Sequence, residues 1–492
     1  MTFKLDCGRQ EWSKRLESSY YPVSPYLYPM ARREDFLESV YEHIDRNLDG
    51  FIEKLREYLR QPSVSATGEG IEQCAHMTAD FLNKLGASVS LVPTDRGRGN
   101  PVVYGKLGLD PGKRTLLIYT HYDTQPFVGQ RWESPPLGAA LVGNKIVARS
   151  SCESKGSLIA LISAIEACKA VEGGLPINLM FVIEGEEEVG SPHLPEFVFA
   201  HARDLSKCDG MLLPGISPED DSANIDVMLG FKGMLYFEFE VKLRDRDLHG
   251  RSATIFDNAA WRLVWALNSL KDKEDRILID GFFDEVLEPT KNDLNMISEI
   301  AKATDEKDLL GFYGAKGFRK GLAGSALFGE YLLSPTLNID GLVSGYTGSG
   351  GSAINPASAL AKVDVRLVAN MNWERTMNLI RNHLRDRGFT DIQIGSIRGY
   401  DASRSPADSK IAKALLQASS RLGLKAVLYP TAPGSAPWYL FTGAPLKIPC
   451  AWQTSLAAQA RMHGPDEFVT IKEYANSTKM AAGIMHYFST VS

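Results

Sequence analysis

A histidine and an aspartate follow one strongly apolar run of the sequence. The run TLLIYT, residues 115–120, leads directly into HYDTQP, which places His121 and Asp123 two positions apart. In an extended segment such side chains point the same way, so Asp123 is placed to orient the His121 imidazole toward a metal ion. The pair alone is a weak signal, because a surface histidine with a satisfied ring has the same spacing.

Four glutamates crowd the end of a second apolar run. INLMFVI, residues 177–183, leads into EGEEEVGS, whose acids are Glu184, Glu186, Glu187 and Glu188. Carboxylates at this density repel one another unless cations or buried protons compensate their charge. The segment therefore fits either a metal site or a solvated acidic loop.

Two further motifs add a carboxylate, a thiol and an imidazole. ARSSCESKGSL, residues 148–158, contains Cys152 and Glu153 just before a predicted helix, and RMHGPDEF supplies His463 beside a turn. Glu153 is either a metal ligand or a carboxylate that the helix dipole favours. Cys152 is either a nucleophile activated at a helix start or a small buried residue.

The segments around these motifs alternate between strands and helices. Apolar spacing predicts helices over 71–85, 156–170 and 194–203, and strands over 87–92, 101–107, 115–120, 177–183 and 210–213. Strands separated by helices of this length favour an α/β fold with a mostly parallel sheet. Ligands of such sheets bind beyond the carboxyl ends of the strands.

The pattern of apolar and polar residues changes after about residue 230. MLYFEFEVKLR, residues 234–244, and LAKVDVRLV, residues 360–368, alternate apolar and polar side chains, which is typical of half-exposed antiparallel strands. A chain of 492 residues is also too long for a single core. We therefore expect an N-terminal arm over 1–33 and an α/β domain made of 34–230 and 401–492, interrupted by an α+β domain over 231–400.

Composition and charge restrict the classes of partner. Lys and Arg total 54 against 60 for Asp and Glu, a net charge of -6, which gives no broad basic field to attract nucleic acid or an anionic membrane. The 6 cysteines form no CxxC pair, so neither a disulfide framework nor a zinc knuckle is expected. No apolar stretch has the length of a signal peptide core or a membrane span. We expect a cytoplasmic protein.

The motifs together, and in this order, carry a specific resemblance. The chain resembles the co-catalytic zinc metallopeptidase family that contains carnosinase-type dipeptidases, aminoacylases, acetylornithine deacetylases and succinyl-diaminopimelate desuccinylases. The resemblance extends over residues 35–490 and is nearest to the dipeptidase branch. The matching segments are THYDTQP, RSSCESKGS, VIEGEEEVGS, DLHG, INPASALAKVDVRLV, PGSAPW and HGPDEF.

The resemblance implies a role for each motif residue. His121 matches a ligand of one metal ion, with Asp123 orienting it, and Glu187 matches the general base. Glu188 and His463 match the terminal ligands of a second ion. Glu153 occupies the position of a carboxylate that bridges both ions, which in the family is an aspartate.

The resemblance also implies a lid. His249, in DLHG, matches a histidine of the inserted domain that reaches the active site of a neighbouring subunit and stabilises the oxyanion, so a homodimer is expected.

Arg366, Asn370 and Ser435 are the residues left to bind a polar group of a small or dipeptide-like substrate. The implied reaction is hydrolysis of an amide or peptide bond with one or two Zn²⁺ ions, Mn²⁺ or Co²⁺ being alternatives.

Several positions depart from the family pattern. Glu153 replaces an aspartate, which lengthens the side chain by one methylene, and Gly215 stands where the family has the aspartate ligand of the His121 ion. The site of Glu153, Glu188 and His463 keeps three ligands, so a single ion should bind there. Substitute donors for the His121 ion remain open: Glu219, Asp220, Asp221 or the Cys152 thiolate.

The substrate side departs as well. Thr431 stands where the dipeptidases have an arginine that pairs with the substrate carboxylate, and Ser352 stands where they have a lysine. Threonine cannot replace a bidentate guanidinium clamp. Two hypotheses follow: a metal-dependent amide hydrolase, or a diverged relative with a degenerate metal site that catalyses another acyl-group reaction or only binds a ligand.

Overall fold

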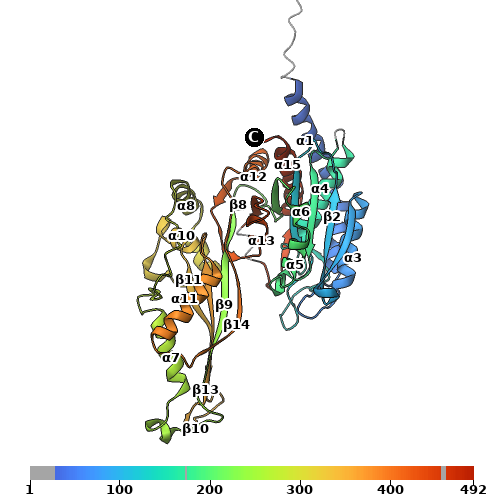
Figure 1. Ribbon diagram of the computed structural model, residues 1–492. Coiled ribbons are helices and arrows are strands. Elements are labelled where there is room, and N and C mark those ends of the chain that lie inside the picture. The colour runs from blue at the N-terminus through green and yellow to red at the C-terminus, as the bar shows by residue number, and fades with distance from the viewer. Residues whose placement is uncertain (1–27, 172–173, 456–460) are drawn as a thin grey trace, which may run out of the picture.

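Two lobes, each built on its own β-sheet, make up the protein (Figure 1). The computed structural model describes residues 28–171, 174–455 and 461–492. Most of the predicted arm, residues 1–27, lies outside these ranges, and residues 28–33 belong to helix α1 (Tyr28–Arg46). Within the described ranges, no helix combines the length and apolar character needed to cross a membrane.

The first lobe contains an eight-stranded sheet. Its order is β1 (Ser88–Thr94), β2 (Gly99–Leu107), β6 (Asn178–Glu184), β3 (Thr115–His121), β7 (Gly210–Leu213), β18 (Cys450–Thr454), β8 (Ile225–Met228) and β16 (Ala426–Tyr429). The central strands β6, β3, β7 and β18 are parallel, whereas β1 and β2 at one edge are antiparallel. This confirms the predicted α/β fold, with a sheet of mixed direction.

Helices cover both faces of this sheet, and the alternation of side chains along β3 explains why. Leu116 and Ile118 belong to the core of one face, and Leu117 and Tyr119 to the core of the other. A strand buried on both sides reads as a continuous apolar run, as TLLIYT does. The first core is built with α1, α2 (Leu48–Arg60), α3 (Ile71–Lys84), α4 (Lys155–Ala170), α12 (Lys410–Arg421) and α15 (Ile471–Thr490). The second includes α5 (Leu194–Ala200), α6 (Ala202–Leu205) and α13 (Tyr439–Thr442).

The second lobe contains a six-stranded sheet. Its main path is the antiparallel order β11 (Thr336–Ser344), β13 (Ser358–Leu367), β9 (Gly230–Lys242) and β14 (Gln393–Tyr400). Helices α7 (Ala259–Leu270) and α11 (Trp373–Asp386) pack on it around a separate core. Two short strands, β15 (Ser403–Arg404) and β17 (Ala432–Ser435), pair with the start of β9.

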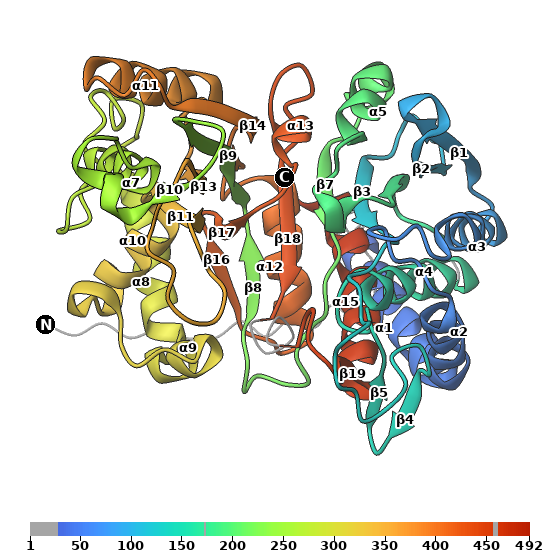
Figure 2. The same cartoon turned by 90° about the horizontal axis from the view of Figure 1, so that it is seen from below.

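Figure 2 shows that β18, β8 and β16 form the side of the eight-stranded sheet nearest the second lobe. Helix α8 (Lys291–Ala303) packs against β16 and against α10 (Gly324–Leu333). The remaining strands form two small sheets: β19 (Phe468–Thr470), β5 (Lys145–Val147) and β4 (Ala140–Val142) form one, and β10 (Leu248–His249) and β12 (Ile354–Asn355) form the other. The remaining helices are short: α9 (Glu306–Tyr313) and the 3₁₀ helices η1 (Asp95–Gly97), η2 (Glu187–Val189), η3 (Gly250–Thr254) and η4 (Arg319–Gly321).

Candidate metal centre

The two motif-bearing strands end side by side. β3 and β6 are parallel neighbours, and their register pairs His121 with Glu184. The acidic segment continues directly into η2, which begins at Glu187. The carboxyl ends of adjacent parallel strands therefore bring the histidine and the glutamates to one edge of the sheet, where such folds bind their ligands.

Asp123 fixes this edge. Its carboxylate is fully buried, lies 3.2 Å from Nδ1 of His121, and accepts the backbone N–H groups of Glu187 at 3.3 Å and Glu188 at 3.1 Å. Burial alone would lower the pKa of His121, but the Asp123 hydrogen bond and the charges of Glu187 and Glu188 outweigh it and raise that pKa well above its usual value. One carboxylate thus orients the imidazole and anchors the loop of the two glutamates.

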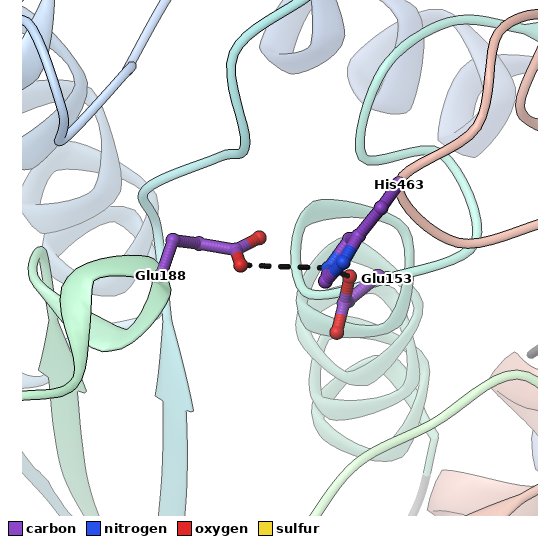
Figure 3. Close-up of side chains that lie close together, drawn as sticks. All are labelled: Glu153, Glu188 and His463. Atoms are coloured by element: carbon purple, nitrogen blue, oxygen red, sulfur yellow. Dashed lines mark ion pairs between the residues drawn. The ribbon is translucent and has the colours of Figure 1, made fainter. Parts of the chain in front are cut away.

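A second cluster combines residues from three distant segments. Nε2 of His463 lies 2.8 Å from Glu153 and 3.4 Å from Glu188, and the three side chains converge from different loops (Figure 3). One ligand atom of each lies within 4.8 Å of the others. Gln125 steadies the cluster through Nε2, which donates to the Glu188 carboxylate at 2.8 Å.

These residues fit a divalent metal ion. One imidazole and two carboxylates form a donor set that suits zinc, and the number of protein ligands equals that of a catalytic zinc site. The hydrogen bonds with Glu153 and Glu188 raise the pKa of His463 to about 10, because the two carboxylates favour a positive charge between them. A cation is the partner that this arrangement of charges calls for.

A buried ion pair holds the two ligand loops together. Arg149 donates to the Glu467 carboxylate at 2.9 Å and to the His463 carbonyl at 3.2 Å. Glu467 in turn accepts the backbone N–H of Cys152 at 3.1 Å, next to Glu153. The pair therefore links the loop of Glu153 to the loop of His463, two of the candidate metal ligands.

Cys152 is a small buried residue, as one of the two sequence interpretations expects. Its thiol donates to Glu467 at 3.3 Å. Burial and the charge of Glu467 raise the pKa of the thiol well above its usual value. These surroundings favour the buried residue over the activated nucleophile, because a nucleophilic cysteine needs a lowered pKa.

The four glutamates of the acidic segment have different surroundings, so the segment is not a solvated loop. Glu184 is buried and accepts hydrogen bonds from Tyr119 at 2.6 Å and Ser191 at 2.9 Å, and burial raises its pKa to about 8. Glu186 lies 2.9 Å from Nδ1 of His193. Only the last two glutamates of the segment face the centre.

Glu187 lines a cavity of about 120 Å³ together with His121, Glu153 and Gly215. Burial raises the pKa of Glu187 to about 7, and the nearby charges of Glu188 and Glu153 act in the same direction. A carboxylate whose pKa lies near neutrality can accept and release a proton at physiological pH. Perturbed carboxylates in a cavity beside a cation site are typical of functional centres.

The predicted substrate residues are only partly gathered here. Ser435 lines the same cavity and accepts a hydrogen bond from Nη1 of Arg366 at 2.8 Å. Asn370, by contrast, is exposed and donates to the Glu285 carbonyl at 2.9 Å. His249 is exposed on β10, which Figure 1 shows at the tip of the second lobe, away from the eight-stranded sheet. Within one chain, the structure therefore does not bring His249 or Asn370 to the centre.

Comparison with known proteins agrees with this geometry. Human Beta-Ala-His dipeptidase is 31% identical over 373 residues, which cover 71% of this chain and 71% of that protein. The Cys-Gly metallodipeptidase dug1 of Schizosaccharomyces pombe is 30% identical, over 71% of this chain and 75% of its own length. Among solved structures, the M20 family metallo-carboxypeptidase Sso-CP2 from Sulfolobus solfataricus superposes with a TM-score of 0.82 at 30% identity, covering 90% of this chain and 99% of that one. Human carnosine dipeptidase 1 gives 0.73 at 25%, with 92% and 100% covered.

Residues 117–487 match the family described as Peptidase family M20/M25/M40. The chain belongs to that family, and it is a hydrolase of the metallopeptidase class. The resemblance read from the motifs is thereby confirmed, including its dipeptidase branch.

The buried ion pair gives a first prediction. Glu467→Gln keeps the shape of the side chain but removes the charge that Arg149 pairs with, so the loops of Glu153 and His463 lose their common anchor. Zinc affinity should fall about 10- to 100-fold, as for other residues that orient metal ligands. Titration against a fluorescent chelator measures this, and circular dichroism confirms the fold.

Glu374→Gln is the matched control, because Glu374 is exposed on α11 in the other lobe. It should leave the zinc affinity unchanged. If folded Glu467→Gln binds zinc as tightly as the control does, the ion pair does not position the ligands.

Proposed function

We propose that this protein hydrolyses an amide or peptide bond in a small amino-acid-derived substrate, with Glu187 as the general base. The observation that carries the proposal is the position of Glu187, whose pKa is raised to about 7, in the same cavity as Glu153 and directly before the ligand Glu188 in the chain. The names of the relatives support the substrate class, because they are dipeptidases.

Each residue of the centre has a separate role in the proposed hydrolysis. A divalent ion held by Glu153, Glu188 and His463 supplies Lewis acidity toward the substrate carbonyl and toward water. Glu187 takes the proton of the attacking water and delivers it to the leaving amine. Asp123 keeps Glu187 in place through the backbone N–H that it accepts at 3.3 Å. The proposed ion is zinc, with manganese or cobalt as alternatives, because the donors are one nitrogen and carboxylate oxygens.

The contacts of the residues at the expected substrate-binding positions favour a second candidate function. Thr431 is buried, and its hydroxyl donates to the Ala432 carbonyl at 3.2 Å, so it offers no cation to a substrate carboxylate. Arg366 already contacts Asp364 at 2.8 Å and Ser435 at 2.8 Å. These contacts favour a diverged member that catalyses another acyl-group reaction or only binds a ligand. Activity toward free dipeptides distinguishes the two functions.

We further propose that the protein is a homodimer formed through residues 231–400, the lid domain between the two parts of the catalytic domain (34–230 and 401–492). The support is an exposed apolar surface of this lobe. Trp261 and Trp265 on α7 are 57% and 55% exposed. Strand β11 pairs only with β13 among the described strands, and its Leu342 and Val343 are 56% and 51% exposed. Apolar surface and an open strand edge of this kind are typical of interfaces. A second copy would also bring a His249 to the centre that lacks one.

A cytoplasmic location is the remaining proposal. The cysteines at positions 74, 168, 208 and 450 are buried and form no disulfide bond within the described ranges. Free thiols persist in a reducing compartment, which supports the cytoplasm.

Replacing the general base tests the proposed reaction. Glu187→Gln should lower kcat about 10²- to 10⁴-fold, because the amide cannot accept the water's proton, while the bound zinc remains. Hydrolysis of β-Ala-His and Cys-Gly, with zinc content measured by mass spectrometry, gives both readouts. Glu186→Gln is the matched control, since its carboxylate is paired with His193. Activity of Glu187→Gln equal to that of the control would refute the role of Glu187.

Complementation tests the shared site. His249→Ala and Glu187→Gln should each be inactive, but a purified mixed dimer should recover about half of the wild-type activity, because one of its two sites then has both intact residues. The measurement is hydrolysis by dimers isolated with two different affinity tags. A mixed dimer as inactive as its parents would show that His249 does not serve the partner's centre.

A further inference from the structure

The position of the missing metal ligand is closed by the neighbouring strand. Gly215 follows β7, and β18 runs parallel beside β7 with Trp452 paired to Leu213. Continuing that register pairs Gln453 with Pro214, so the Gln453 carbonyl lies beside Gly215. A Cβ atom built on Gly215 would lie 1.8 Å from the Gln453 carbonyl oxygen and 3.2 Å from Nε1 of Trp452. No side chain fits at residue 215 unless β18 moves.

Movement of β18 is opposed by its own contacts. Gln453 is buried, and its Nε2 donates to Ser217 Oγ at 2.7 Å and to the Gly215 carbonyl at 3.3 Å. On its other edge, Gln453 is paired with Val227 of β8. The strand is therefore held between two neighbours in the middle of the sheet. The group that meets the Gly215 Cβ position is therefore a backbone carbonyl held in the sheet rather than a mobile side chain.

Of the substitute donors that the sequence leaves open, Cys152 alone lines the cavity, and none belongs to the group of three donors found among the described residues. Asp220 and Asp221 are exposed, and Asp220 accepts the backbone N–H of Ser222 at 3.0 Å. The Cys152 thiol is buried and donates to the Glu467 carboxylate at 3.3 Å. Among the described residues, a single group of three donors can hold an ion, that of Glu153, Glu188 and His463. His121 is not part of it.

We propose that this chain has a one-metal centre: a single divalent ion binds Glu153, Glu188 and His463, and the Gln453 carbonyl leaves residue 215 no room for the side chain that a second ion beside His121 would need. This rests on the proposed function, since it specifies the ion that the hydrolysis uses. The residues on the His121 side do not fit an ion, because one imidazole and a shared carboxylate fall short of the three protein ligands of a catalytic zinc site. His121 instead serves as a hydrogen-bonded partner of Asp123.

Metal stoichiometry is the first test, and it does not depend on activity. The full chain, loaded with excess zinc and freed of unbound ion by gel filtration, should contain one equivalent by mass spectrometry. His463→Ala should lose that equivalent, and His121→Ala should keep it. Two equivalents in the wild type, or loss of an equivalent in folded His121→Ala, would overturn the inference.

A matched pair of variants tests whether the Gln453 carbonyl excludes a side chain at residue 215. Gly215→Ala and Gly215→Asp should lower Tm by similar amounts, because the first atom of either side chain meets the Gln453 carbonyl. Saturating zinc should raise the Tm of both variants equally, and both should still bind one equivalent. A second equivalent in Gly215→Asp, or a zinc-dependent gain in Tm seen with aspartate and not with alanine, would overturn the inference.

The outcomes also separate this inference from the proposed function. One equivalent of zinc without hydrolysis of any amide substrate supports the one-metal centre and refutes the hydrolase. Two equivalents with hydrolysis support the hydrolase and refute the one-metal centre. A wild type that binds no zinc refutes both.

Discussion

Mutual repulsion between the carboxylates of Glu153, Glu187 and Glu188 is the constraint that the rest of the centre serves. Three like charges around one small cavity are unfavourable unless something positive and something rigid hold them there. His463 contacts Glu153 and Glu188, and a divalent ion would satisfy these two carboxylates more completely than a proton can. Glu187 has a raised pKa and is left to exchange a proton.

The supporting contacts are arranged around that constraint. The Asp123 carboxylate accepts hydrogen bonds from one imidazole and two backbone N–H groups, so it orients its neighbours instead of adding another ligand. Arg149 and Glu467 form an ion pair that joins the loop of Glu153 to the loop of His463. Because these anchors are buried, the ligands are positioned before an ion arrives, and little ordering is needed on binding.

The sequence was sufficient to predict the local elements and the residues of a candidate metal centre. Strand β7 has the predicted bounds, and the neighbouring elements differ by one or two residues, because apolar runs of this length are fixed by burial on both faces. The predicted helix over 194–203 divides into α5 and α6, a break that apolar spacing does not reveal. The roles of Glu153, Glu188 and His463 followed from motif resemblance, and the structure brings exactly these side chains into contact.

The sequence was insufficient where distant segments meet. The sequence shows Gly215 at the position of a family ligand, but not that a side chain there would meet Gln453, because that contact, 238 residues along the chain, depends on the register between β7 and β18. Arg149 and Glu467 lie inside recognisable motifs, yet their pairing across 318 residues is visible only in the folded chain. Glu184 and Glu186 belong to the same acidic segment as Glu187 and Glu188. Only the folded structure shows that the first two side chains contact other residues, away from the centre.

The most direct measurement is a crystal structure of zinc-loaded protein with anomalous data collected on both sides of the zinc absorption edge. The one-metal account predicts a single anomalous peak, bounded by Glu153, Glu188 and His463, with the Gln453 carbonyl still against Gly215. A second peak between His121 and Glu153 would contradict it.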